Sequence, residues 1–221
     1  MLIAVHKRFN SYSPRKRRLI ILVGIIVGII LVLGISFAVY AGRVFYIKTV
    51  GILVTPSQDY EVRAVQYYLQ NDPDWSGDTI GHSQSSLGGT GCLIACVASG
   101  VTDLGVPVTP KELNQQLTVV DGFEVDNLIW YKINEAFPEV NYTYDRVFSA
   151  ATLEKDLRAG RLPIINVKYH GNGVTHWVMV VGAKDGEFLV YDPANGDKKP
   201  IPLSVHGRVY AYRVLVPIAV G

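Results

Sequence analysis

Cysteine is scarce in this sequence, which contains only Cys92 and Cys96 among 221 residues. The two lie four positions apart in a segment that predicts a single helix, where a disulfide between them would distort the backbone. The disulfide framework typical of small exported domains is therefore missing. HExxH and paired CxxC motifs are also missing, and no histidine stands at ligand spacing from either cysteine. We expect no metal site and no cofactor.

Residues 19–41 lack charge altogether. This segment, LIILVGIIVGIILVLGISFAVYA, is long enough to cross a bilayer as a helix. Residues 1–18 lack acidic side chains but contain six basic ones, which are Lys7, Arg8, Arg15, Lys16, Arg17 and Arg18. Because positive charge is retained on the cytoplasmic side, we expect a single-pass membrane protein with residues 1–18 as a cytoplasmic tail and the C-terminal domain outside the cytoplasm.

A cleaved signal peptide has the same order of basic and apolar segments and is the alternative to a retained anchor. The apolar run is long for a signal peptide, and no small-x-small cleavage site follows it cleanly, so we favour the anchor. Gly24 and Gly28 form a GxxxG motif that would suit a helix-mediated dimer, although glycine is common in membrane helices without such a role.

The formal net charge of +2 is explained by the basic tail. The rest of the chain is net negative, so nothing indicates nucleic-acid binding. Residues 42–56 predict a short tether, with Tyr46 and Lys48 suited to the membrane interface. Residues 57–221 then form the exported domain.

The exported domain divides into a helical half and a strand-rich half. Helices are predicted from Cys92 to about Leu104, from a Thr109 cap onward, over residues 124–137, and over a short segment that stops at Gly160. Strands are predicted at 162–169, 176–183, 187–192 and 208–216. The turn at residues 184–186, Lys-Asp-Gly, predicts a hairpin, and the short connections imply an antiparallel meander. The expected fold class is α+β.

Cys92 stands at the start of its predicted helix, directly after the glycine-rich segment GGTG. A thiol attacks as its thiolate, which a helix N-terminus and an imidazole partner both favour. The glycines allow a sharp turn and close approach of a substrate, and the same N-terminus offers backbone N–H groups to an oxyanion. Cys96, one turn further along among small apolar residues, is most simply a buried hydrophobe.

Five histidines are candidates for the base. His6 lies in the cytoplasmic tail, and His206 lies in a late loop between proline-containing segments. His82, in the loop before the cysteine, stays open as an alternative. His170 and His176 flank the segment GNGVT, and His176 begins an apolar strand.

The position of Asp192, at the end of the next strand of the predicted hairpin, favours His176 as the base. In an antiparallel hairpin the start of one strand lies beside the end of the other, so we expect the two side chains to be neighbours. A carboxylate beside an imidazole fixes its tautomer and stabilises the imidazolium. Taken alone, His176 is explained as a structural residue at a strand end, and Asp192-Pro193 as a turn. The expected contact between His176 and Asp192 favours a catalytic role for both.

Over residues 60–217 the chain resembles the C39-like (peptidase C39 type 2) branch of the papain-like cysteine peptidases. The resemblance rests on YYLQNDPDW, GTGCLIACVA, VTPKELNQQL and HWVMVVGAKDGEFLVYDPANG, taken in this order and spacing. It implies a papain-like fold, with N-terminal helices packed on an antiparallel sheet. It also implies Cys92 as nucleophile, His176 as general base, Asp192 as the residue that orients it, and Gln70 as a side-chain donor in the oxyanion hole.

These features together predict a membrane-anchored cysteine peptidase-like hydrolase that cleaves a peptide or amide bond outside the cytoplasm. Its expected partners are a peptide or protein substrate and the membrane. The alternative is a catalytically silent C39-like domain that binds a peptide or a membrane-protein partner. Transfer of the acyl group to an amine instead of water also stays open. Neither the substrate nor the oligomeric state follows from the sequence.

Overall fold

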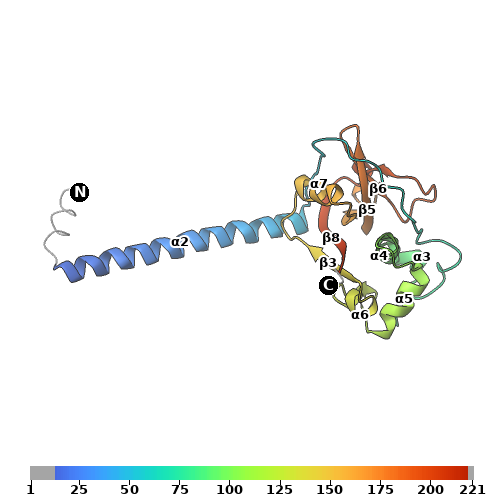
Figure 1. Ribbon diagram of the computed structural model, residues 1–221, viewed down its shortest axis with the longest axis horizontal. Coiled ribbons are helices and arrows are strands. Elements are labelled where there is room, and N and C mark those ends of the chain that lie inside the picture. The colour runs from blue at the N-terminus through green and yellow to red at the C-terminus, as the bar shows by residue number, and fades with distance from the viewer. Residues whose placement is uncertain (1–12, 219–221) are drawn as a thin grey trace. The chain divides into compact units, whose positions relative to one another are not determined.

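Residues 13–218 are described by a computed structural model, and the chain divides into two compact units, Met1–Phe45 and Tyr46–Gly221. The first is dominated by helix α2 (Pro14–Thr49), which contains the whole charge-free segment (Figure 1). By length and composition α2 is suited to cross a membrane, a test that a signal sequence near an N-terminus also passes. Lys7 and Arg8 of the basic tail lie outside the described residues.

Helix α2 extends beyond the predicted span at both ends, and the tether predicted at 42–56 is wrong in part. Residues 42–49 are helical, Ile47 is buried in the second unit, and Ile52 forms an antiparallel bridge with Val209. No glycine or proline interrupts the helix after Gly42 until Gly51, which adopts a left-handed φ of 75°. The segment is therefore part of a folded unit rather than a free linker.

The second unit is built on a six-stranded antiparallel sheet in the order β3-β8-β4-β5-β6-β7. Its strands are β3 (Val140–Tyr144), β4 (Pro163–Lys168), β5 (Thr175–Lys184), β6 (Glu187–Tyr191), β7 (Ile201–Pro202) and β8 (Val209–Pro217). Strands β4, β5 and β6 form the first part of the predicted meander, and the short β7 continues it. Strand β8 does not extend it, because β8 returns to lie between β3 and β4. Strands β3 and β7 were not predicted.

Both faces of the sheet are buried. Alternate residues of the central strands enter different cores, so that Ile164 and Met179 contribute to one and Ile165 and Val178 to the other. This explains why the strand sequences are nearly continuous apolar runs instead of alternating polar and apolar residues. Leu153 of α7 (Ala150–Arg158) belongs to the second core.

The first core is completed by α4 (Cys92–Asp103), α5 (Pro110–Val119) and α6 (Lys132–Ala136), with the short α3 (Leu87–Thr90) before them (Figure 1). The predicted start of α5 is confirmed: the Thr109 hydroxyl accepts from Glu112 N, and the Glu112 carboxylate accepts from Thr109 N. Two single turns of 3₁₀ helix, η1 (Tyr169–Gly171) and η2 (Leu203–Val205), lie in loops.

The helix predicted over residues 124–137 is wrong over most of its length. Strands β1 (Phe123–Glu124) and β2 (Asn127–Leu128) pair there as a small hairpin, and only α6 is helical. Val125 lies in the turn at a φ of 61° with its side chain exposed, whereas Leu128 and Ile133 are buried. Helical spacing of apolar residues here reflects separate elements that reach the same core. The α+β class itself is confirmed.

Candidate active site

The segment before Cys92 makes two successive turns that place the thiol at the start of α4. Ser86 caps α3 by accepting a hydrogen bond from Gly89 N, and Gly91 N donates to Leu87 O at 2.9 Å. A Cβ at Gly91 would collide with that same carbonyl oxygen, so only glycine fits at this position. Cys92 follows as the first residue of α4 and is 7% exposed. The glycine at position 91 is therefore explained by the close approach of the backbone to the preceding turn.

The hairpin of β5 and β6 brings His176 and Asp192 together. Its turn is at Asp185 and Gly186, both at positive φ, and the strands pair from there to Met179 opposite Tyr191, with a one-residue shift in register between Val180 and Gly182. His176 Nε2 lies 2.6 Å from Asp192 Oδ1, and both side chains are buried. The contact expected from the sequence is present.

The charges of this pair are strongly coupled. Burial alone would lower the pKa of His176, but hydrogen bonds to the Asp192 carboxylate and to Cys92 outweigh it and raise the pKa to about 9. Because Nε2 faces Asp192, Nδ1 is the ring nitrogen left for the sulfur. Burial would raise the pKa of Asp192, yet its contacts with His176 and His206 hold that pKa well below its usual range. The raised pKa of His176 favours the imidazolium form beside the ionised Asp192 carboxylate.

His206 is a member of this cluster that sequence reasoning missed. Its side chain is fully buried, and Nε2 lies 3.3 Å from Asp192 Oδ2, within ion-pair distance but poorly aligned for a hydrogen bond. Nδ1 accepts a hydrogen bond from His170 N at 3.3 Å. A neutral imidazole that accepts at Nδ1 carries its proton on Nε2, so the Nε2–H group is directed to the carboxylate. Asp192 is thus contacted by two imidazoles, one on each oxygen.

Tyr169 closes the same cluster with its aromatic ring. The ring packs edge-on against His176, with centroids 5.2 Å apart, and lies 6.1 Å from the ring of His206. His170, which precedes the GNGVT segment, adopts a left-handed φ of 49°; its backbone N–H donates to His206 Nδ1, and its ring centroid lies 5.9 Å from that of His206.

Gln70 lies between the two halves of the site. Its backbone N donates to Pro193 O, and its side-chain Nε2 donates to Gly88 O at 2.9 Å, while Oε1 is buried without a partner. Only the amide nitrogen can face the Gly88 carbonyl, so the orientation of the side chain is determined. The residue predicted from the family resemblance alone therefore adjoins both the glycine turn before Cys92 and the residue after Asp192.

The remaining candidates lie elsewhere. Cys96 is completely buried with its sulfur 3.5 Å from Trp177 O; burial raises its pKa, and the nearby Cys92 adds to the rise. His82 lines a separate cavity with Phe123. His6 lies outside the described residues. Within residues 13–218 no group of three or more His, Cys, Asp or Glu side chains is placed to hold a metal ion.

A cleft of about 180 Å³ opens beside the thiol. Cys92 and Leu93 line one side, Asp126 and Leu128 of the β1–β2 hairpin line another, and Trp177 of β5 closes it. The cleft therefore has mixed walls, to which Thr90, Asn127 and Thr175 add polar groups, and its size suits a single side chain of a peptide.

The second unit combines a buried thiol, imidazole and carboxylate with an α+β fold that solved structures share. A candidate C39-like peptidase from Bacillus anthracis matches with a TM-score of 0.50, covering 72% of this chain and 98% of its own, at 11% sequence identity. At that identity the similarity shows a common fold. No family model matches the chain, and no curated protein matches it significantly.

Proposed function

We propose that this protein is a membrane-anchored cysteine peptidase-like hydrolase of papain-like architecture that acts outside the cytoplasm. The observation that carries the proposal is the buried His176, whose Nε2 lies 2.6 Å from Asp192 Oδ1 and whose pKa the neighbouring Asp192 and Cys92 raise to about 9 against the effect of burial. These are the nucleophile, base and orienting group that acyl transfer through a thiol requires, and they meet at a helix N-terminus. The C39-like fold supports the same class of reaction.

In the proposed reaction the Cys92 thiolate attacks the carbonyl carbon of a peptide or amide bond, and the carbonyl π electrons move to its oxygen. His176 gives its Nδ1 proton to the leaving amine as the C–N bond breaks, which leaves a thioester on Cys92. Water then loses a proton to His176 and attacks the thioester carbon, the C–S bond breaks, and the carboxylic acid leaves as the Cys92 thiolate and the imidazolium are restored. Asp192 stays ionised throughout and holds the imidazole in place.

The oxyanion formed in these steps needs donors close to Cys92. The first N–H groups of α4 have no partner within the helix, so the backbone N–H of Cys92 is suited to the task. One hydrogen of the Gln70 amide is engaged by Gly88 O, which leaves the second for the oxyanion. Removal of such a donor costs on the order of 100-fold in rate in related chemistry.

The membrane anchorage is proposed from α2 and the basic tail. A helix that long and apolar would hold the second unit close to the bilayer, and the positive charge before it would keep the tail in the cytoplasm. The substrate would then be a peptide or protein that reaches the membrane surface from outside.

The test uses the full-length chain in nonionic micelles and a peptide-like probe with a thiol-directed electrophile, with the modified cysteine identified by mass spectrometry. We expect rapid labelling of Cys92, no labelling in Cys92→Ala, slower labelling in His176→Ala, and native labelling in Cys96→Ala. Cys96 should stay unmodified until the protein unfolds, because it is fully buried. If Cys92 reacts no faster than a free model thiol and His176→Ala makes no difference, the silent binding domain is the better account.

A further inference from the structure

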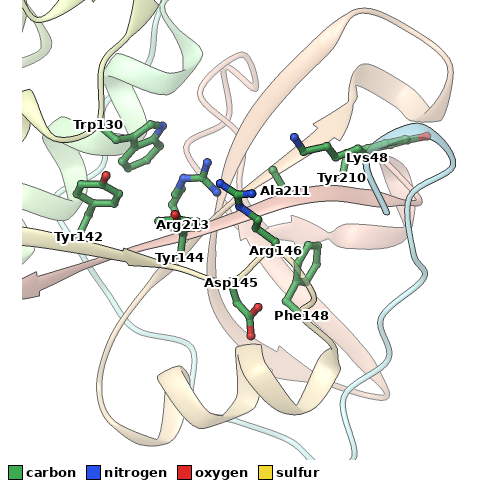
Figure 2. A pocket seen from close by; sticks show the side chains of 10 residues that line it. All are labelled: Lys48, Trp130, Tyr142, Tyr144, Asp145, Arg146, Phe148, Tyr210, Ala211 and Arg213. Carbon is green, nitrogen blue, oxygen red and sulfur yellow. The ribbon is translucent and has the colours of Figure 1, made fainter. Parts of the chain in front are cut away.

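A second cavity, of about 300 Å³, lies over strands β3 and β8 and is lined by positively charged and aromatic side chains (Figure 2). It is separate from the cleft at Cys92. Trp130 forms part of its wall and packs against Trp177, which closes the cleft, with ring centroids 5.9 Å apart. The mechanism proposed above uses none of the residues that line this cavity.

Three cations converge on the cavity without acidic partners. Figure 2 shows the amine of Lys48 and the guanidinium groups of Arg146 and Arg213 directed to the same region. Among residues 13–218 no carboxylate lies within ion-pair distance of any of the three. The single acid in the lining, Asp145, points away from them in Figure 2 and accepts a hydrogen bond from Val147 N at 2.9 Å.

Arg213 is held rigidly in this lining. Its guanidinium carbon lies 4.8 Å from the ring centroid of Tyr144 and 5.6 Å from that of Trp130, and Nη1 donates to Tyr212 O. Nε is buried and has no hydrogen-bond partner. Burial lowers the pKa of Arg213, and the charge of Arg146 adds to the lowering. A buried unpaired donor beside a second guanidinium is costly unless an anion accompanies it.

The chemistry of the lining indicates the ligand. Guanidinium groups match the oxygens of a phosphate, and three unpaired cations suit a group with more charge than a single carboxylate. Aromatic side chains next to Lys and Arg are typical of the membrane interface. Lys48 follows the predicted span by only seven residues, which as a helix is about 10 Å, so the chain keeps this cation near the headgroup layer.

We propose that this cavity binds a phosphate group and that the headgroup of an anionic phospholipid supplies it. The lipid source rests on the membrane anchorage proposed above, whereas the anion site rests on the lining alone. Bound in this way, the headgroup would hold the second unit against the bilayer independently of α2. The site would orient the exported unit on the surface that carries its substrate.

The experiment titrates full-length protein in nonionic micelles with phosphatidylglycerol, phosphatidylcholine or inorganic phosphate at constant ionic strength, and follows tryptophan fluorescence. We expect saturable binding of phosphatidylglycerol, with the half-saturation point raised about fivefold by loss of one cation in Lys48→Gln or Arg146→Gln. Both residues are exposed, so these substitutions leave folding intact. Lys199→Gln removes the same charge from an exposed position outside the cavity and should bind as the native protein does.

The outcomes separate the claims. Equal affinity for inorganic phosphate and for phosphatidylglycerol would overturn the lipid source, as would equal affinity for phosphatidylcholine. An acidic peptide titrated in the same way should bind more weakly than phosphatidylglycerol; tighter binding of the peptide would overturn the phosphate assignment. Unchanged binding in both Lys48→Gln and Arg146→Gln would overturn the site itself. Cys92→Ala should bind lipid normally, so failure of the hydrolase proposal would leave this result unaffected.

Discussion

Two substitutions of His206 separate its two contacts. His206→Asn keeps an acceptor where Nδ1 meets His170 N but removes the group that faces Asp192. His206→Gln keeps an amide N–H near the position of Nε2 but removes the acceptor for His170. The two variants therefore differ in which polar group is left alone, and Asn also lacks one buried methylene group that Gln keeps.

At pH 7 both variants should be less stable than the native protein. Loss of a contact to an ionised group costs about 1.5 kcal/mol at the low end of such contacts, which suits the poor alignment at 3.3 Å. Loss of the backbone contact costs about 1 kcal/mol. These two losses of stability are too close to distinguish the variants at pH 7, but the stability of the two variants should depend differently on pH.

The pH dependence follows from the lowered pKa of Asp192. A carboxylate whose folded pKa is depressed contributes stability above its unfolded pKa, and loses this contribution as the pH falls through the folded pKa. His206→Asn removes one cause of the depression, so its loss of stability in acid should be smaller, and should end at a higher pH, than that of His206→Gln. Other carboxylates titrate in the same range, but their effects are common to both variants.

The measurement is urea unfolding of the full-length variants in nonionic micelles from pH 7 to pH 2.5, with the alkylation rate of Cys92 at pH 7 as a second readout. His206→Asn should slow alkylation, because Asp192 no longer holds its orientation beside His176. His206→Gln, which keeps an N–H group near Asp192, should be alkylated at the native rate. Superimposable acid limbs and equal alkylation rates would refute a positioning role and leave His206 as a packing residue.

Three further predictions concern the base, the turn and the topology. Because the pKa of His176 is raised to about 9, hydrolysis should fall as the pH rises through about 9, and an NMR titration of the ring should show Asp192→Asn moving this titration to lower pH. Gly91→Ala should reduce probe labelling at least tenfold by forcing the turn apart, whereas Gly77→Ala, where a Cβ meets open space, should not. Protease added to intact cells should degrade residues 43–221; survival of this part until lysis would place the site in the cytoplasm.

The parts of the structure that the sequence predicted are those with local causes. The Thr109 and Glu112 cap, the Asp185–Gly186 turn and the start of α4 at Cys92 each depend on a few adjacent residues. The contact of His176 with Asp192 is also local, because a tight hairpin brings the start of β5 beside the end of β6. The one-residue shift in register between Val180 and Gly182 could not be predicted from the turn.

The parts that were missed depend on distant segments. Strand β3 has a half-polar sequence, VNYTY, and becomes a strand by pairing with β8. The burial of His206 depends on η2 folding back over the end of the sheet, and the loop sequence carries no periodicity that predicts it. One signal could have suggested this burial. His206 lies between Leu203 and Val209, two apolar residues that both belong to the second core.

The central position of β8 has a consequence for when the second unit can fold. Of the six strands β8 is the latest in sequence, yet it separates β3 from β4. On the proposed topology, β3 would have no partner and β4 would have an open edge until residues 209–217 had crossed the membrane. A chain emerging from a translocation channel would expose these edges throughout its export, and the sheet that carries the thiol site would be complete only when the final strand arrived. Export and formation of the site would then be coupled by the order of the strands.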